Sequence, residues 1–196
     1  MTLSQLFRFA SLQHPQLIAL NQAGLVEKFT DAIVWIFLPV FFLSQSLSLI
    51  EASGIIAIYG VVWGASQLIT GALSDKIGRK VLIVWGMWLC GLGVLALPLT
   101  HSVWLWSIES AIIGVGMAML YPNLGAAVAD IAPVQQRASL LGIYRFWRDL
   151  GYAIGALLMG ILAQWSQDVL TPFWMVGIAM LLSGAWVNRY FIAIPI

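Results

Sequence analysis

Three charged residues interrupt the first long apolar run of this sequence. Glu27, Lys28 and Asp31 are separated by three and four positions, which places them on one face of a helix. A pair of carboxyl groups in apolar surroundings can bind and release a proton, because burial and like-charge repulsion both favour the protonated form. Alternatively, Lys28 extends toward lipid headgroups and neutralises one acid. The spacing leaves both interpretations open.

A second charged group stands in another apolar run. Arg145, Asp149 and Tyr152 follow one another at i, i+4 and i+7, and Arg148 lies beside them. We expect Arg145 to pair with Asp149, because pairing lowers the cost of holding both charges in a membrane. Such a pair has two possible uses, which are a lock on a gate and a site for a substrate anion or a proton.

A short basic turn joins two further apolar runs, and it carries a specific pattern. Gly71 permits close approach of another helix, and Gly78 gives the backbone the freedom for a sharp reversal. Asp75 can accept backbone N–H groups at a neighbouring helix N-terminus. Arg79 and Lys80 can bind lipid phosphates or pair with Asp75.

The amino-acid composition indicates that these residues lie in a lipid bilayer. Of 196 residues, 61% are hydrophobic and only 9% are charged, whereas a water-soluble domain carries about 25% charged residues. We therefore expect an all-α polytopic membrane protein with no extramembrane catalytic domain. A net charge of +1 with scattered basic residues excludes nucleic acid as a partner. The single cysteine and two distant histidines give no metal site, and no cofactor or enzymatic activity is predicted.

The apolar runs predict six membrane-spanning helices. Their residue ranges are 17–45, 54–73, 80–98, 104–128, 139–163 and 171–190. Residues 1–16 hold no spanning run and predict a cytoplasmic amphipathic segment with Leu3, Leu6, Phe7 and Ala10 on one stripe. The bundle is predicted to occupy residues 17–196.

The basic residues predict the orientation of these helices. With six spans, all nine Lys and Arg residues fall on one side, the side that becomes cytoplasmic. Both termini are therefore expected in the cytoplasm. The charged residues of spans one and five and the glycines of span two predict that these helices face the bundle interior, while spans three and six face lipid.

The run from Gly71 to Lys80 resembles the G-x-L-x-D-x-x-G-R-K loop of the major facilitator superfamily of secondary transporters. The stretch from Ala129 to Gly155 resembles the segment that joins helices ten and eleven of many bacterial members. The resemblance covers the C-terminal half of the fold, helices seven to twelve. It implies that spans one and four line a substrate cavity, with Tyr121 and Asn123 as candidates beside a bending proline, Pro122.

The resemblance further implies how such a chain works. Spans two and five would flank the contact with another six-helix half, and Asp75 would meet the start of span five across that contact. We expect secondary active transport of a small solute across the bacterial inner membrane, coupled to an ion, namely the proton. The second half would be another copy of this chain or a separately encoded partner. The alternative is a truncated fragment or a membrane assembly protein without transport activity of its own.

Overall fold

Residues 2–192 of the chain are described by a computed structural model, in which long helices run the length of one bundle. The N-terminal segment comprises α1 (Leu3–Arg8) and the π-helix η1 (Phe9–Gln13). The first rod is α2 (Pro15–Ala32), the π-helix η2 (Ile33–Phe37) and α3 (Leu38–Ser44). The others are α4 (Leu49–Ile77), α5 (Arg79–Ala96) with η3 (Leu97–Leu99), α6 (Val103–Ile131), η4 (Val134–Gln136) with α7 (Arg137–Ser166), and α8 (Thr171–Tyr190).

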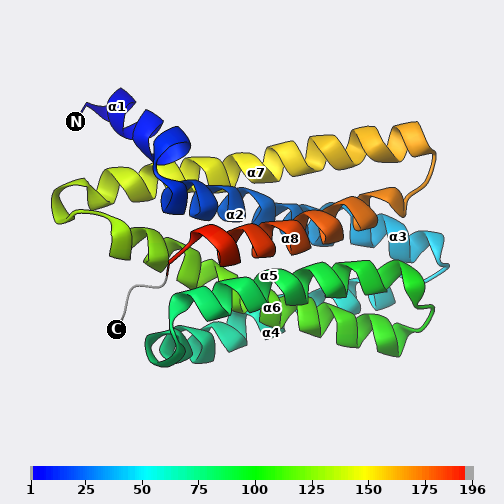
Figure 1. Cartoon of the computed structure of the whole chain (residues 1–196). Coiled ribbons are helices and arrows are strands. Elements are labelled where there is room, and N and C mark those ends of the chain that lie inside the picture. Colours follow the sequence, from blue (N-terminus) through cyan, green and yellow to red (C-terminus); the bar gives the residue numbers. More distant parts are fainter. Residues whose placement is uncertain (1, 193–196) are drawn as a thin grey trace.

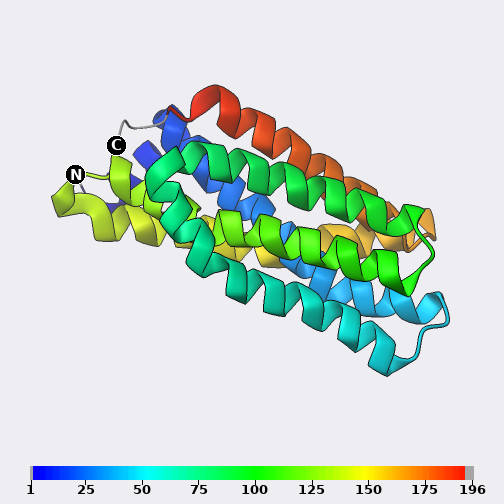
Figure 2. The same ribbon diagram turned by 90° about the horizontal axis from the view of Figure 1, so that it is seen from below.

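The rods pack in an order that differs from their order in the chain. Helix α2 packs between α7 and α8. Helix α8 also packs against α5, and both α5 and α4 pack against α6. Helix α1 and the last turn of α8 lie at the same end of the bundle as the α4–α5 turn and the α6–α7 connection (Figures 1 and 2). We call this the basic end. It is defined by the helix ends at Pro15, Ile77, Arg79, Ile131 and Arg137.

Local sequence signals set the ends of these helices. Ser48 and Glu51 form a reciprocal capping box at the start of α4. Gly78 ends α4 with φ of +88°, a conformation that a residue with a side chain rarely adopts, and α5 begins at the next residue. Pro15 and Pro172 stand in the first turns of α2 and α8, where the missing N–H breaks no helical hydrogen bond.

Four of the helices are long and apolar enough to cross a membrane. They span Leu49–Ile77, Arg79–Leu99, Val103–Ile131 and Val134–Ser166. Helix α2 has only 18 residues and contains all three charged residues of the first run, which removes it from this group. The number of spans predicted from sequence, six, therefore stays a prediction, as does the extension of the bundle over residues 193–196, which lie outside the described residues.

The N-terminal segment packs against the bundle with part of its predicted stripe. Leu6 and Ala10 are buried, whereas Leu3 and Phe7 are exposed. The amide of Asn21 donates to the Ala10 carbonyl oxygen at 3.0 Å. The stripe is divided within the regular helix α1, where Phe7 lies at the edge of the contact and its ring centre is 5.7 Å from that of Phe146 on α7. The position of this segment relative to a membrane stays a prediction.

Glycines bring α2 and α7 into direct backbone contact. A Cβ atom at Gly151 would overlap the carbonyl group of Leu25, and one at Gly155 would lie 2.6 Å from the Phe29 ring. A Cβ atom at Gly160, farther along α7, would meet nothing within 4 Å. Only the first two glycines therefore hold the α2–α7 contact together.

Replacing Gly151 by Ala is expected to lower the free energy of unfolding by about 1–3 kcal/mol, the usual cost of overpacking. Thermal unfolding of the purified chain in detergent measures this effect. The matched control is Gly160→Ala, which should leave stability unchanged or raise it slightly, because alanine favours a helix. Equal melting temperatures for the two variants would contradict the close contact at Gly151.

Helix α6 continues through Pro122 with help from a neighbouring helix. Proline lacks an N–H group, so the carbonyl of Ala118, one turn earlier, loses its usual partner. The hydroxyl of Thr70 on α4 donates to that carbonyl oxygen at 2.6 Å. The backbone group that Pro122 releases is therefore satisfied without water.

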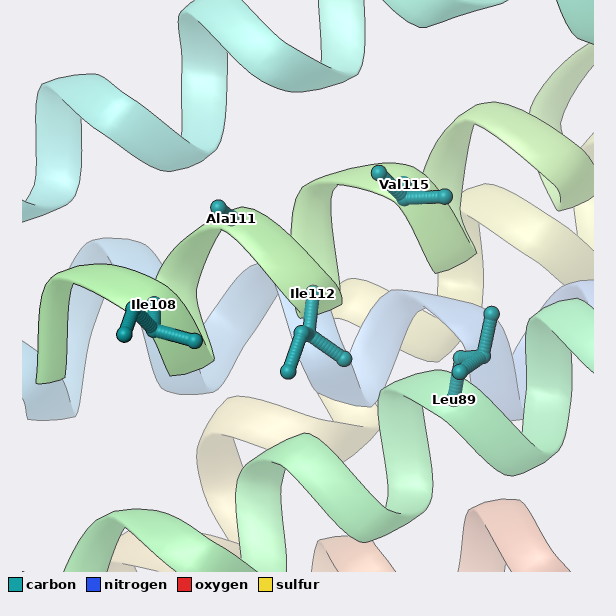
Figure 3. Close-up of a pocket in the computed structure, with 5 residues that line it drawn as sticks. All are labelled: Leu89, Ile108, Ala111, Ile112 and Val115. Carbon is teal, nitrogen blue, oxygen red and sulfur yellow. The ribbon is translucent and has the colours of Figure 1, made fainter. Parts of the chain in front are cut away.

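One apolar hollow of about 280 Å³ opens between α5 and α6. Leu89, Ile108, Ala111, Ile112 and Val115 line it, and no charged residue does (Figure 3). It shares none of its lining with the charged groups predicted from sequence, which lie elsewhere in the bundle.

Candidate functional site

The charged residues of α2 form a buried ionic group. The Nζ atom of Lys28 lies 2.6 Å from Asp31 Oδ2 and 3.7 Å from Glu27 Oε1. All three residues are buried. In this structure Lys28 therefore turns toward the two acids, and it does not extend to headgroups.

The two carboxyl groups differ in how they are satisfied. Asp31 accepts a hydrogen bond at each oxygen, from Lys28 at Oδ2 and from the hydroxyl of Tyr59 at Oδ1, both at 2.6 Å. Glu27 is 0% exposed, and neither of its oxygens has a hydrogen-bond partner within the described chain. Both oxygens of Asp31 are therefore satisfied, whereas Glu27 lacks the donors that an anion needs when it is removed from water.

This group lies near the middle of the first rod. At 1.5 Å per residue, Glu27 is about 18 Å and Asp31 about 24 Å from the start of α2 at Pro15, and about 20 Å of helix follows Asp31 to Ser44. Tyr59 reaches Asp31 from α4, more than two dozen residues away in sequence. A tyrosine in an apolar run gave no pattern that could have identified this partner.

Tyr121 on α6 connects the α2 group with α7. Lys28 Nζ lies 5.1 Å and the Arg148 guanidinium 5.3 Å from the centre of its ring, within the range of cation–π attraction. Asn123, its predicted companion, is buried and donates to the Met119 carbonyl of its own helix at 2.8 Å. Tyr121 therefore contacts the ionic group, whereas Asn123 makes no hydrogen bond to it.

The prediction that Arg145 pairs with Asp149 is wrong. Asp149 Oδ1 instead accepts from its neighbour Arg148, at 2.8 Å from Nη2 and 2.9 Å from Nε. Arg145, Asp149 and Tyr152 do share an exposed face of α7, as their spacing predicts. The carboxylate turns toward Arg148 because that guanidinium is anchored at the edge of this face by Tyr121.

The α4–α5 turn forms its own ion-pair group at the basic end. Arg79 Nε donates to Asp130 Oδ2 at the end of α6, and Arg79 Nη2 lies 3.8 Å from Asp75 Oδ1. Asp75 is 70% exposed at its side chain, and a Cβ atom at Gly71 would meet nothing within 4 Å. Within this chain, Asp75 thus pairs with Arg79 and caps no helix of the described bundle. Lys80 lies half-buried beside them.

Sequence reasoning missed Asp130 as the partner of Arg79. Its position was informative, because an acid at the last turn of one span lies at the same end of the bundle as the basic turn. What the sequence did not contain was the neighbour relation between α6 and the α4–α5 turn.

A bundle of long apolar helices with an ionic group near mid-length has the architecture of a multi-pass membrane protein. The chain belongs to the Major Facilitator Superfamily, whose family model matches residues 23–195. The superfamily transports solutes and is not a class of enzymes.

Individual relatives agree with this assignment. An uncharacterised MFS-type transporter of Methanocaldococcus jannaschii is 30% identical over 118 residues, which is 60% of this chain and 30% of that protein. The methyl viologen resistance protein SmvA of Salmonella typhimurium is 33% identical over 144 residues, 71% of this chain and 29% of that protein. The chain spans about a third of the length of the relatives it matches.

Solved structures share the fold. The crystal structure of the peptide transporter POT in complex with sulfate superposes with a TM-score of 0.80 and 24% identity. The match covers 90% of this chain and 38% of that one. At this identity the likeness extends to the fold alone.

Proposed function

We propose that this chain is the C-terminal six-helix half of a proton-coupled secondary transporter that moves a small solute across the bacterial inner membrane, with both termini in the cytoplasm. The observation that carries the proposal is the buried carboxyl group of Glu27, which has no hydrogen-bond partner and lies beside the Lys28–Asp31 pair. A buried ionised carboxylate that accepts no hydrogen bond is costly even with Lys28 Nζ at 3.7 Å, a cation that Asp31 already holds at 2.6 Å. Glu27 therefore carries the proton in this conformation.

Protonation of Glu27 changes its electrostatic interaction with the charged groups around it. Lys28 and Asp31 share its helix, and Arg148 on α7 lies on the Tyr121 ring that also meets Lys28. Loss of the proton places a second anion beside Lys28, which is then shared between two carboxylates. The resulting attraction for Lys28 and Arg148 differs between the two protonation states, and this difference is what a proton gradient needs to drive a conformational change.

A second six-helix bundle would pack against α4 and α7. These two helices were expected from sequence to face the bundle interior, yet they are the least enclosed of the four long apolar helices, since 22% and 17% of their most apolar stretches are buried, compared with 61% for α5. Their open surface includes Gly60, Gly64 and Gly160, beside which a Cβ atom would meet almost nothing. Glycine surfaces of this kind favour close contact between membrane helices. The exposed Asp75 would then cap a helix of that second bundle, as the motif implies.

Transport by reconstituted vesicles tests the proposal directly. The full chain, alone or co-expressed with a second half, is placed in vesicles that contain a pH-sensitive dye. Addition of dipeptides, sugars or organic cations should cause a proton flux for at least one solute class, above the flux of protein-free vesicles. No coupled flux with either preparation would overturn the proposal.

Cysteine cross-linking tests the second bundle separately. In a Cys90→Ala background, Val61→Cys on the open side of α4 is expected to cross-link across the bundle contact, because Val61 is 70% exposed beside Gly60 and Gly64. A product at twice 21.5 kDa indicates a self-pair, and any other mass a different partner. The matched control is Leu92→Cys on α5, 57% exposed, which should stay uncross-linked. Equal cross-linking of both positions would contradict a specific contact at α4.

A further inference from the structure

Tyr144 on α7 fills a space between α2 and α6. It is only 2% exposed. A Cβ atom at Gly24 on α2 would lie 2.6 Å from its Cε2 atom, and a Cβ atom at Gly125 on α6 would lie 3.9 Å from its Cε1 atom. The ring therefore keeps this position because Gly24 has no side chain.

Tyr144 contacts the charged residues of the bundle through its ring. The ring centre lies 5.9 Å from Cζ of Arg148. The Oη atom is buried and has no hydrogen-bond partner within the residues that the structure describes. Because a buried hydroxyl group without a partner is unfavourable, phenylalanine is expected to fill the same space at least as well. A role of Tyr144 beside Arg148 therefore belongs to the ring.

Arg148 contacts two aromatic rings and one acid. Its Cζ atom lies 5.3 Å from the ring centre of Tyr121 and 5.9 Å from that of Tyr144, and its Nη2 atom lies 2.8 Å from Asp149 Oδ1. Its side chain is only 17% exposed. Cation–π attraction is stronger when the cation is removed from water, so both rings help to hold the guanidinium group. We call Tyr121 and Tyr144 the arginine seat.

Asp149 has two arginines within reach along its own helix. It follows Arg145 by four positions, a spacing at which side chains on a helix meet, and it follows Arg148 by one. Consecutive side chains on a helix point about 100° apart. The observed pairing with Arg148 therefore requires that this guanidinium group be held in place, which the arginine seat does.

The two rings of the arginine seat belong to different helices. Tyr121 lies on α6 and Tyr144 on α7. The Tyr121 ring is also 5.1 Å from Lys28 Nζ, so the seat holds Arg148 beside the ionic group of α2. A movement of α6 relative to α7 would separate the two rings and release the guanidinium group.

We propose that Tyr144 is a positioning residue, whose ring holds Arg148 against Tyr121. The arginine seat thereby selects Arg148 over Arg145 as the partner of Asp149. When the seat opens, the ion pair of Asp149 passes from the first arginine to the second. This role rests on the proposed function, since it concerns a cation that lies beside the ionic group of the transporter.

Labelling of the full chain in detergent with phenylglyoxal, which modifies accessible guanidinium groups, tests this role by mass spectrometry at each arginine. Tyr144→Leu is expected to raise the modification rate of Arg148 about fivefold, the change that loss of one partly buried cation–π contact allows. The rate at Arg145 should fall, because this residue gains Asp149 as a partner. A general loosening of the bundle would raise both rates.

Three further variants keep the test independent of a folding defect. Tyr144→Phe retains the ring and should be labelled as the parent is. Gly24→Ala should displace the ring and change both rates in the same directions as Tyr144→Leu, whereas Gly142→Ala on α7, where a Cβ atom would meet nothing within 4 Å, should change neither. Faster labelling of both arginines in Tyr144→Leu, or equal labelling of Tyr144→Leu and Tyr144→Phe, would overturn the role of the ring.

Proton flux in vesicles separates this role from the proposed function. Tyr144→Leu should lower the flux, and Tyr144→Phe should restore it. Labelling needs no transport, so opposite changes at the two arginines without any flux in the parent chain would overturn the proposed function alone. Flux in the parent chain without those opposite changes in Tyr144→Leu would overturn the positioning role alone.

Discussion

A Glu27→Gln variant is expected to reduce gradient-driven transport to the level of protein-free vesicles while the chain still folds. Glutamine has the shape of a protonated glutamate and cannot release a proton, so it fixes the group in one state. Because Glu27 is fully buried and accepts no hydrogen bond, the neutral amide should fit without loss of stability. The variant therefore separates proton coupling from folding.

Infrared difference spectroscopy gives the measurement that needs no substrate. A step to higher pH should remove the C=O band of a protonated carboxyl group in the parent chain, and this band should be absent in Glu27→Gln. Glu51→Gln is the control, since Glu51 lies exposed at the start of α4. The same band in both variants would mean that another acid takes up the proton.

A Lys28→Met variant is expected to lose about 3–5 kcal/mol of stability, the usual result of removing one partner from a buried ion pair. Lys28 is the cation that contacts both acids of α2. Without it, the buried Asp31 carboxyl group keeps Tyr59 as its hydrogen-bond donor and loses the cation beside it. The loss should therefore exceed that of any single surface substitution in this chain.

Thermal unfolding in detergent measures this loss, with the exposed Lys76→Met as the matched control. A Lys28→Met, Asp31→Asn double variant should recover much of the stability, because no unpaired charge then remains between the helices. If the double variant is less stable than either single one, the pair does not contribute in the way its geometry indicates.

The sequence predicted those parts of the fold that depend on neighbouring residues in the chain, such as the positions of single helices. The predicted runs 104–128 and 171–190 correspond to α6 and α8, because apolar length and flanking polar residues set helix position. The N-terminal stripe was less accurate, since Leu3 and Phe7 are exposed, and spacing alone does not show how much of a helix face its neighbours cover. The three charged residues of α2 indicate that this helix lies inside the bundle. The same residues lower its hydropathy, which makes α2 harder to recognise as a membrane-spanning helix.

The site followed from sequence only within single helices. The Lys28–Asp31 pair was accessible from spacing, because both residues lie on one turn of α2. The partners Tyr59 and Asp130 were not, since each depends on which helices are neighbours. The spacing put Arg148 next to Asp149 in sequence. It did not show that Arg148, which lies on the Tyr121 ring, is the arginine that pairs with Asp149.

The hydrogen bond from Thr70 to the Ala118 carbonyl would restrict how the bundle rearranges in the transport cycle proposed for it. Any sliding of α4 along α6 would strand a bare oxygen in hydrocarbon, where no solvent molecule can replace the lost donor. We therefore expect α4 and α6 to move together in the proposed transport cycle, so that any rearrangement occurs between this pair and the remaining helices.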